Sequence, residues 1–255
     1  MNQLLASLMF FTRLPWWRLK TVPTAAFEHV ADWWPLMGWL TGGTMAVVFL
    51  VASLLGFGSL VTALLTVVSR LLLTGALHED GLADFFDGFG GGTSRERTLL
   101  IMKDSHIGTY GVLGLMVCVG LLVAFLAELS SSLAGAVLIL LFDVSAKCAA
   151  SFITGQLPYA RTAESAKNGV VYVGRSPRGW MLHLLRCALA LALPVALCFV
   201  VGVTDVLLLL PVPFFVEYLL MCWMRRRLGG YTGDCCGALF LLSELSLYLT
   251  LYILY

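Results

Sequence analysis

Eleven consecutive residues, His78 to Gly88, place four acidic side chains inside a chain that is otherwise strongly apolar. Asp80, Asp84 and Asp87 are spaced at i, i+4 and i+7, so on a helix they fall on one stripe. Two bare carboxylates about 4 Å apart repel by roughly 4 kcal/mol at an effective dielectric of 20. Such a stripe needs a counter-charge, and a hard divalent cation is the natural candidate. The spacing therefore predicts that these three aspartates bind Mg²⁺.

Two other interpretations of this acidic stripe stay open. It could be a solvated helix face, although like charges at i, i+4 destabilise a helix and no basic residue is interleaved here. It could also be an acidic ring in a cation channel or transporter. The residues that follow the stripe favour a phosphate ligand instead.

A glycine-rich stretch runs from Gly88 to Gly92 and is followed by basic residues. Glycines permit close backbone approach and positive φ, so consecutive amides can cup an anion. The stretch is not a Walker A loop, because the Lys-Ser/Thr ending is missing. We expect a diphosphate to be held here by Gly90, Gly91, Gly92, Arg95, Arg97 and Lys103.

Asp104 lies just before the third apolar stretch, at its polar end. It could be a fourth carboxylate ligand, or the base that receives a hydroxyl proton. The alternative is that Asp104 or Ser105 caps the next helix. His106 is expected to make a hydrogen bond to the substrate rather than bind the metal, because Mg²⁺ prefers oxygen ligands.

Two further polar patches could contact phosphate. Arg161 ends the sequence Pro-Tyr-Ala-Arg, and a run of arginines that includes Arg227 precedes the turn at Asp234. The arginine run could also be only a topology anchor. We predict substrate contacts from Arg161, Arg227 and Asp234.

The composition indicates an integral membrane protein. The chain is 60% hydrophobic and only 12% charged, whereas a soluble domain carries about a quarter charged residues. Its net charge of +1 gives no indication of a nucleic-acid partner. Seven apolar stretches are long enough to span a bilayer: 35–56, 59–77, 108–128, 133–154, 180–202, 204–224 and 236–255.

The expected fold is all-α: a polytopic membrane bundle of about seven transmembrane helices, forming one domain over residues 1–255. Residues 1–34, rich in tryptophan, are expected to form an interfacial segment. The polar segments 78–107, 155–179 and 224–235 fall on one side of the membrane in this arrangement, and 78–107 is the expected active-site segment.

The basic residues are concentrated in the polar segments that this arrangement places on one side of the membrane. The turns at 57–58, 129–132 and 202–205 contain no Lys or Arg, whereas the polar segments contain many, Lys167 among them. The positive-inside rule then places the polar segments in the cytoplasm. Asp143 and Lys147 fall inside one span at i, i+4 and are expected to neutralise one another.

Carboxylate-bound Mg²⁺, glycine amides and cationic side chains together suit phosphoryl transfer. At a membrane face, the expected reaction joins a nucleotide-activated group to an alcohol, with one partner a lipid or large amphiphile.

Several segments resemble, in order along the chain, the signatures of the cobalamin synthase family, the adenosylcobinamide-GDP ribazoletransferases. They are Phe11–Pro15, His78–Gly88, Ile101–Gly108, Pro158–Arg161, Leu228–Ala238 and Ser243–Leu245. Two departures are Glu79, where the family commonly has an apolar residue, and Cys235-Cys236, which replaces a more usual Thr-Leu.

The resemblance implies a Mg²⁺-dependent enzyme of the bacterial inner membrane, with its active-site loops in the cytoplasm. A hydroxyl of α-ribazole, or of its 5′-phosphate, would attack the phosphorus attached to adenosylcobinamide, and GMP would leave. Partners would be these substrates and membrane lipid, with no nucleic acid and a possible homo-oligomer. The implied metal ligands are Asp80, Asp84, Asp87 and Asp104, with Asp87 and Asp104 also catalytic.

Two alternatives remain at this point. A CDP-alcohol phosphotransferase of phospholipid synthesis carries a related pattern of aspartates, but its Ala-Arg pair and closing spacing are missing here. An ion-coupled transporter would explain the spans and the buried charges, but not the glycine-rich segment after the acids.

Overall fold

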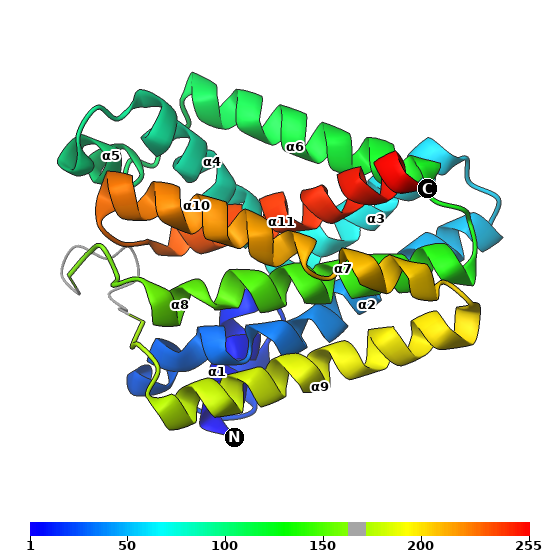
Figure 1. Cartoon of the computed structure of the whole chain (residues 1–255), viewed down its shortest axis with the longest axis horizontal. Helices are drawn as coiled ribbons and strands as arrows, with labels where there is room; N and C mark the ends of the chain where they lie inside the picture. Colours follow the sequence, from blue (N-terminus) through cyan, green and yellow to red (C-terminus); the bar gives the residue numbers. More distant parts are fainter. Residues whose placement is uncertain (163–171) are drawn as a thin grey trace.

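The structure of the protein is a computed structural model that describes residues 1–162 and 172–255. Within these ranges it consists of helices and contains no strand, which confirms the expected all-α class (Figure 1). Part of the predicted polar segment 155–179, including Lys167, lies outside the described residues.

Most of the predicted spans correspond to single helices. The long helices are α2 (Trp34–Leu54), α3 (Ser59–Thr74), α6 (Thr109–Glu128), α7 (Leu133–Ser151), α9 (Pro177–Val201), α10 (Val212–Leu228) and α11 (Gly233–Leu254). The shorter helices are α1 (Asn2–Phe11), α4 (Leu77–Gly91), α5 (Arg95–Ile101) and α8 (Ile153–Gln156), with 3-10 helices η1 (Trp16–Arg18), η2 (Thr24–Asp32) and η3 (Thr204–Leu209). In the described part, six helical segments are long and apolar enough to cross a membrane, or seven if the bent pair α3–α4 counts as one span.

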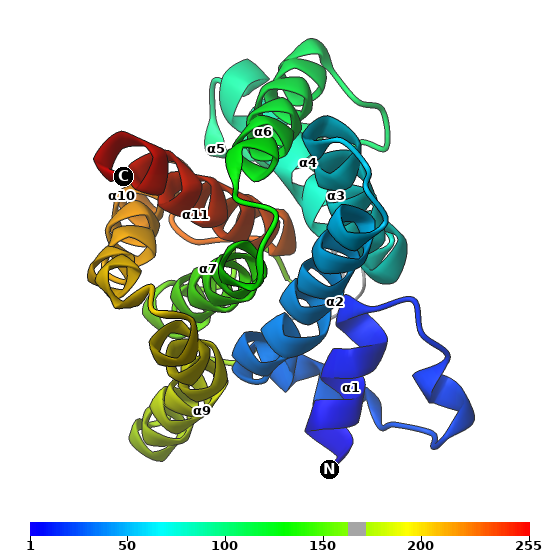
Figure 2. The ribbon, with the colours of Figure 1, turned by 90° about the vertical axis from the view of Figure 1, so that its right-hand side faces the viewer.

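Helix α7 lies in the middle of the bundle, with α2, α9 and α11 around it (Figure 2). In the apolar window of Leu133–Gln156, 94% of the residues are buried, against 22% in α6 and α9. Helix α2 approaches α7 closely because it carries Gly38 and Gly42 there. A Cβ atom on Gly42 would lie only 2.8 Å from the Cβ atom of Asp143.

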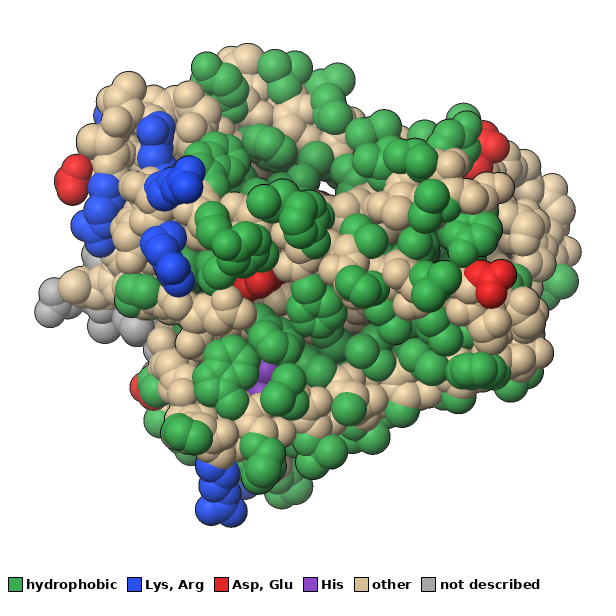
Figure 3. All heavy atoms as spheres, in the orientation of Figure 1, with side chains coloured by type: hydrophobic (Ala, Val, Ile, Leu, Met, Phe, Trp, Pro, Cys, Tyr) green, Lys and Arg blue, Asp and Glu red, His purple; other side chains and the backbone are tan. Residues whose placement is uncertain are grey.

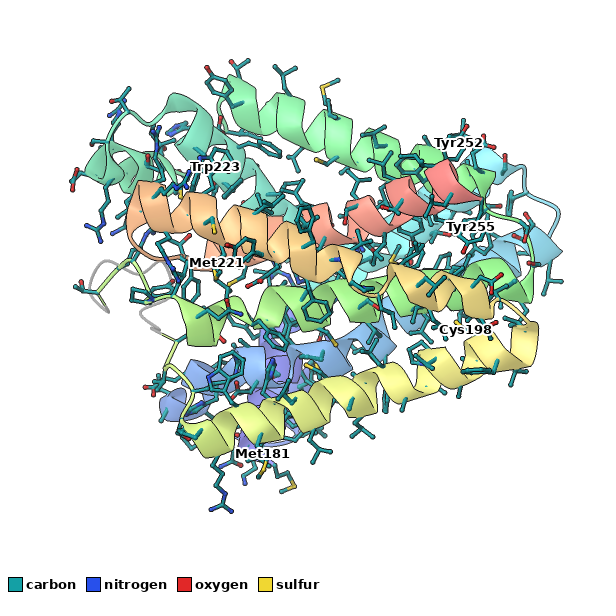
Figure 4. The ribbon with its side chains drawn as sticks, in the orientation of Figure 1. Met181, Cys198, Met221, Trp223, Tyr252 and Tyr255 are labelled. Carbon is teal, nitrogen blue, oxygen red and sulfur yellow. The ribbon has the colours of Figure 1, made fainter. Side chains whose placement is uncertain are left out.

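The outer helices present apolar side chains outward, as a lipid-facing surface requires. Met181 on α9 is 63% exposed and points away from the bundle (Figure 4), and Tyr252 on α11 is 64% exposed. The visible face is largely hydrophobic, and its Lys and Arg side chains gather at the end that holds α5 and the C-terminus of α10 (Figure 3). This asymmetry matches the predicted separation of polar segments from short turns. Which compartment that end faces stays a prediction.

The second predicted span, 59–77, differs from the structure at its end. Helix α3 stops at Thr74, and α4 departs at an angle of 92°. The break is made by Gly75 and Ala76, whose φ angles are +66° and +56°. The backbone amide of Arg13 donates a hydrogen bond to Leu73 O at 2.7 Å, and its guanidinium lies against Gly75. The polar segment is therefore a helix that leaves α3 sideways and packs between α6 and α11.

Substitution of Gly75 tests this break. Gly75→Ala adds the left-handed strain of an L-residue, about 1–2 kcal/mol, and also displaces the Arg13 guanidinium. Gly202→Ala is the matched control, because Gly202 has φ +75° and no neighbouring atom within 4 Å of an added Cβ. We expect both variants to lower the free energy of unfolding in mixed micelles, Gly75→Ala by the larger amount. Equal losses would show that the Arg13 contact contributes nothing to the break.

A cluster of charged side chains lies buried where α3, α4, α7 and α11 meet. The predicted pair is confirmed, with Lys147 Nζ 2.6 Å from Asp143 Oδ1. Arg70, on α3, lies 2.6 Å from a carboxylate oxygen of Glu244 and 3.7 Å from both Asp143 and Glu79. Glu79, the departure from the family pattern, thus faces the interior of the bundle and an arginine.

Candidate active site

A pocket of about 210 Å³ opens between α1, η2, α2, α4 and α11. Its charged lining residues are Asp80 from α4, Asp234 from α11 and Arg161 from the segment that follows α8. The rest of the lining is mostly aromatic or aliphatic. The pocket therefore offers two carboxylates and a guanidinium beside an apolar wall.

Close packing of α4 on α11 brings the two aspartates to the same pocket. A Cβ atom on Gly81 would lie 3.1 Å from the Cα atom of Asp234, and one on Gly237 would lie 2.8 Å from His78 O. Both glycines are needed because larger residues would push the helices apart. The hydroxyl of Thr232 caps the start of α11 by accepting a hydrogen bond from the Cys235 amide at 3.4 Å, which fixes the first turn that carries Asp234.

The three aspartates of the stripe lie on α4 as predicted, but in different surroundings. Asp80 lines the pocket and Asp84 is half-buried one turn further on. Asp87 is buried, and its carboxylate accepts hydrogen bonds from the backbone amides of Gly108 at 2.7 Å and Gly111 at 2.8 Å. Asp87 thus satisfies two amides at the start of α6. Its neighbours must be glycine, because a Cβ atom on either would overlap this carboxylate.

The capping role of Asp87 can be tested separately from its predicted metal role. Asp87→Ala leaves two amides at the α6 terminus without an acceptor and is expected to cost about 1–2 kcal/mol of stability. Asp87→Asn keeps a side-chain oxygen and is expected to cost less, because Asn caps about as well as Asp. Unfolding in mixed micelles measures both. Equal stability of the two variants would contradict the capping role, and loss of turnover in a stable Asp87→Asn protein would support the predicted metal role.

The glycine-rich stretch does not form the loop that the sequence predicts. Gly90 and Gly91 belong to α4, and the Gly92 amide donates to Gly88 O at 2.9 Å. None of these glycines has positive φ. Close neighbours restrict two of them: a Cβ atom on Gly90 would overlap the ring of Tyr110, and one on Gly92 would overlap the side chain of Thr98. The predicted loop of backbone amides that cups an anion is therefore wrong. A contact between this stretch and a diphosphate stays a prediction.

Two arginines predicted to bind phosphate hold backbone segments together. Arg95 Nε donates to Leu228 O at 2.7 Å, and another guanidinium nitrogen of Arg95 donates to Ala160 O at 3.0 Å. Arg161 donates to Leu99 O at 3.1 Å and is buried, yet it lines the pocket. Of the two, only Arg161 can also reach a ligand in the pocket.

The loop before α6 carries Lys103, Asp104 and His106, all exposed and outside the pocket lining. The Asp104 carboxylate accepts hydrogen bonds from the His106 amide at 3.0 Å and lies 2.7 Å from its ring Nδ1. These contacts hold the pKa of Asp104 below its ordinary value, which makes it a weaker base. The alternative that Asp104 caps α6 is wrong, because α6 begins at Thr109 and Asp87 serves its amides.

The remaining predicted substrate contacts are not in the pocket either. Arg97 is exposed on α5, and Arg227 is half-buried in the last turn of α10. Arg227 is the last of three arginines at this helix end, a position where cations are stabilised by the helix dipole. Of this predicted patch, Asp234 lines the pocket and Arg227 does not.

The carboxylates of the pocket determine whether Mg²⁺ could bind there. Across residues 1–162 and 172–255, no group of three or more His, Cys, Asp or Glu side chains is arranged to hold a metal ion. A complete protein cage is not the usual mode for Mg²⁺, which commonly uses one or two carboxylates together with waters and substrate phosphates. Asp80 and Asp234 in one pocket fit that mode, with Asp84 one turn away on α4.

Sequence reasoning missed the aromatic wall of the pocket, made by Phe10, Phe11 and Trp34 with Tyr159 and Tyr172. Trp34 was expected at the membrane interface but is 1% exposed and stacked on Phe11 at 5.2 Å between ring centroids. Burial raises the pKa of Tyr159 to about 12, so its hydroxyl keeps its proton at neutral pH. The only sequence signal was that Phe11 and Tyr159 belong to the quoted motifs.

The fold and this pocket define a polytopic helical membrane protein with an internal site that combines carboxylates, a guanidinium and aromatic rings. Comparison with known sequences is more specific. The model of the cobalamin-5-phosphate synthase family matches residues 3–252, and the chain belongs to this family, a family of transferases of cobalamin synthesis.

Curated relatives agree along nearly the whole length. A protein of Shewanella amazonensis named adenosylcobinamide-GDP ribazoletransferase is 37% identical over 98% of this chain and 95% of its own. Proteins of the same name from Vibrio cholerae and Vibrio parahaemolyticus are 38% and 32% identical, over 97% and 100% of this chain and 92% and 93% of theirs. No solved structure matches the chain. The predicted family is thereby confirmed, and the comparisons give no support to a CDP-alcohol phosphotransferase or a transporter.

Proposed function

We propose that this enzyme joins adenosylcobinamide-GDP to α-ribazole, or to α-ribazole 5′-phosphate, in a Mg²⁺-dependent reaction that releases GMP. The observation that carries the proposal is the pocket in which Asp80, Asp234 and Arg161 meet, in a chain whose relatives are named for this reaction. The product is adenosylcobalamin or its 5′-phosphate, so the reaction completes the nucleotide loop.

The bonds follow from the substrates. A ribose hydroxyl oxygen forms a bond to the phosphorus attached to cobinamide, the bridging P–O bond breaks, and GMP leaves with the bridging oxygen. The hydroxyl proton passes to a carboxylate. Mg²⁺, when bound, neutralises charge on the diphosphate.

The three charged residues of the pocket and three further aspartates have roles in this proposal. Asp80 and Asp234 would hold the ion together with the substrate's phosphate oxygens, with Asp84 as a further ligand. Arg161 would pair with a phosphate oxygen. Two further aspartates are proposed to contribute to metal binding or proton transfer: Asp87, which caps α6, and Asp104, on the exposed loop. For Asp104 to do so, its loop would have to approach the pocket.

The proposal includes the location and orientation of the enzyme. The enzyme lies in the bacterial inner membrane, in contact with lipid, with the basic end and its loops in the cytoplasm. Both substrates then reach the pocket from the cytoplasmic side. A homo-oligomer is compatible with this arrangement and is not required by it.

Nucleotide release is the direct test. Purified enzyme is incubated with adenosylcobinamide-GDP and α-ribazole, and the nucleotide product is identified by chromatography. We expect GMP and cobalamin in equal amounts. Release of CMP from a CDP-activated lipid, with no GMP from the corrinoid, would overturn the proposal in favour of a CDP-alcohol phosphotransferase.

Metal removal gives a further prediction. Exhaustive chelation is expected to lower the rate of GMP release at least about a hundredfold, since a bound metal supplies several kcal/mol of transition-state stabilisation. Readdition of Mg²⁺ or Mn²⁺ should restore the rate, and an equal concentration of K⁺ is the control. Undiminished turnover in the chelated enzyme would contradict the metal requirement.

A further inference from the structure

We propose that the aromatic part of the pocket binds the benzimidazole base of the ribazole acceptor, with the buried ring of His78 as its hydrogen-bonding partner. This inference rests on the proposed function and names where one of the two substrates binds. It assigns recognition of the base to Phe11, Trp34 and His78, which no part of the phosphate chemistry requires.

The size of the pocket selects a small planar group. Its volume is about 210 Å³, below the roughly 300–1,000 Å³ of sites that enclose whole drug-sized ligands. An apolar cavity of roughly 150 Å³ can hold a benzene molecule. The pocket is therefore large enough for a two-ring base and too small for a corrin ring or a complete nucleoside diphosphate.

The shape of the wall suits a flat ring. The rings of Phe11, Trp34 and His78 are parallel to one another within 4°, with centroids between 5.2 and 6.1 Å apart. A planar base inserted beside them can stack on a preformed surface, as offset aromatic pairs prefer. Tyr159 and Tyr172 line the same pocket, in edge-to-face contact with each other at 5.5 Å.

His78 supplies a specific polar contact. It lines the pocket and is 2% exposed, yet neither ring nitrogen has a hydrogen-bond partner. A buried polar group without a partner is costly and calls for an explanation, which a bound ligand would supply. The base of α-ribazole, once bonded to ribose, keeps one ring nitrogen with a free lone pair. A neutral imidazole N–H of His78 can donate to that nitrogen.

The same lining disfavours guanine, the other base in the reaction. Among the described residues, no Asn, Gln, Ser or Thr side chain lines the pocket. Guanine carries several donors and acceptors on its edge, and each one buried without a partner costs affinity. The charged residues Asp80, Arg161 and Asp234 are assigned to phosphate and metal in the proposed function. A base with one polar atom matches what remains.

The arrangement also joins the two halves of the site. His78 and Asp80 are two residues apart on α4, and both line the same pocket. Within this one pocket, a nucleoside whose base contacts His78 can place its ribose toward Asp80, where the diphosphate is proposed to bind. The attacking hydroxyl is placed by the base, so recognition of the base and positioning for attack are coupled.

His78→Phe is the principal test, because it keeps an aromatic ring in the stack and removes both nitrogens. Thermal unfolding should be unchanged or shifted upward, since two unpaired buried atoms disappear. The KM for α-ribazole should rise about tenfold, with the KM for adenosylcobinamide-GDP within about twofold of wild type. Trp34→Phe should also raise the KM for α-ribazole. Trp33→Phe, at the neighbouring residue outside the pocket lining, is the control and should change neither KM.

The outcomes separate this inference from the proposed function. If the wild-type enzyme releases GMP but the His78 and Trp34 variants raise only the KM for adenosylcobinamide-GDP, the pocket binds the guanine or corrinoid side and the inference is overturned. Unchanged KM values for both substrates in stable variants overturn it as well. If the wild-type enzyme releases no GMP, direct titration with α-ribazole still decides it: quenching of tryptophan fluorescence in wild type, weakened about tenfold by His78→Phe, supports the site, and no binding refutes it.

Discussion

Asp80→Asn is expected to lower the rate of GMP release by about a hundredfold to a thousandfold while the protein keeps its fold. The substitution removes a negative charge from the pocket in which the diphosphate and Mg²⁺ are proposed to bind. An ion worth several kcal/mol to the transition state corresponds to two or three decades in rate. Asp80 is exposed in the first turn of α4, so the cost to stability should be only the lost helix-dipole interaction, about 0.3–1 kcal/mol.

The control for this variant is Asp205→Asn. Asp205 is also an exposed aspartate in the first turn of a helix, but it lies in η3, far along the chain from the pocket lining. Two quantities are measured: the steady-state rate at saturating Mg²⁺ and the dependence of the rate on Mg²⁺ concentration. Both should change in Asp80→Asn, and neither should change in Asp205→Asn. A wild-type rate and a wild-type Mg²⁺ dependence in a folded Asp80→Asn enzyme would remove Asp80 from the proposed site.

The bundle was predictable because its signal is local. A stretch of about 20 apolar residues specifies a spanning helix whatever its neighbours are. The break after Thr74 was not predictable in the same way. Its first residue, Gly75, is an ordinary helix-ending signal. The second is Ala76, whose φ of +56° is one that L side chains rarely adopt and that an alanine in the sequence does not signal. The angle of 92°, and hence the direction of α4, depends on this pair of residues.

The candidate site shows the same division. Periodicity correctly placed three aspartates on one side of a helix, but it does not say which neighbour each one meets. Asp80 meets the pocket, whereas Asp87, two turns later, meets the start of α6. The pairing of Asp80 with Asp234 depends on two close approaches between α4 and α11, of Gly81 to the backbone of Asp234 and of Gly237 to the backbone of His78. Only the family resemblance linked those two segments.

The buried charges next to this site raise a separate question of stability. Two bases, Arg70 and Lys147, face three acids, Glu79, Asp143 and Glu244, at the meeting point of four helices. Lys147 Nζ also lies 3.7 Å from the centroid of the Phe240 ring. Charges at this depth are tolerated only when paired. The charges of the cluster therefore depend on one another, and loss of one member leaves the others uncompensated.

Arg70→Met is accordingly expected to lower the free energy of unfolding by about 3–5 kcal/mol, the range for breaking a buried ion pair. It leaves Glu244 without its 2.6 Å partner and three acids facing Lys147 alone. Methionine fills much of the arginine volume, so the loss reports charge rather than a cavity. Equilibrium unfolding by SDS in mixed micelles measures the effect. Arg178→Met, at an exposed position in the first turn of α9, is the control and should stay within about 0.5 kcal/mol of wild type.

The double variant Arg70→Met with Glu244→Met distinguishes an uncompensated charge from lost packing. It removes one base and one acid together and leaves Lys147 with Asp143 and Glu79. Because replacing both members of a buried pair by apolar residues is often neutral, we expect it to recover at least about half of the stability lost in Arg70→Met. If the double variant is as unstable as the sum of the two single variants, the pair is uncoupled, and Arg70 stabilises the bundle through packing instead.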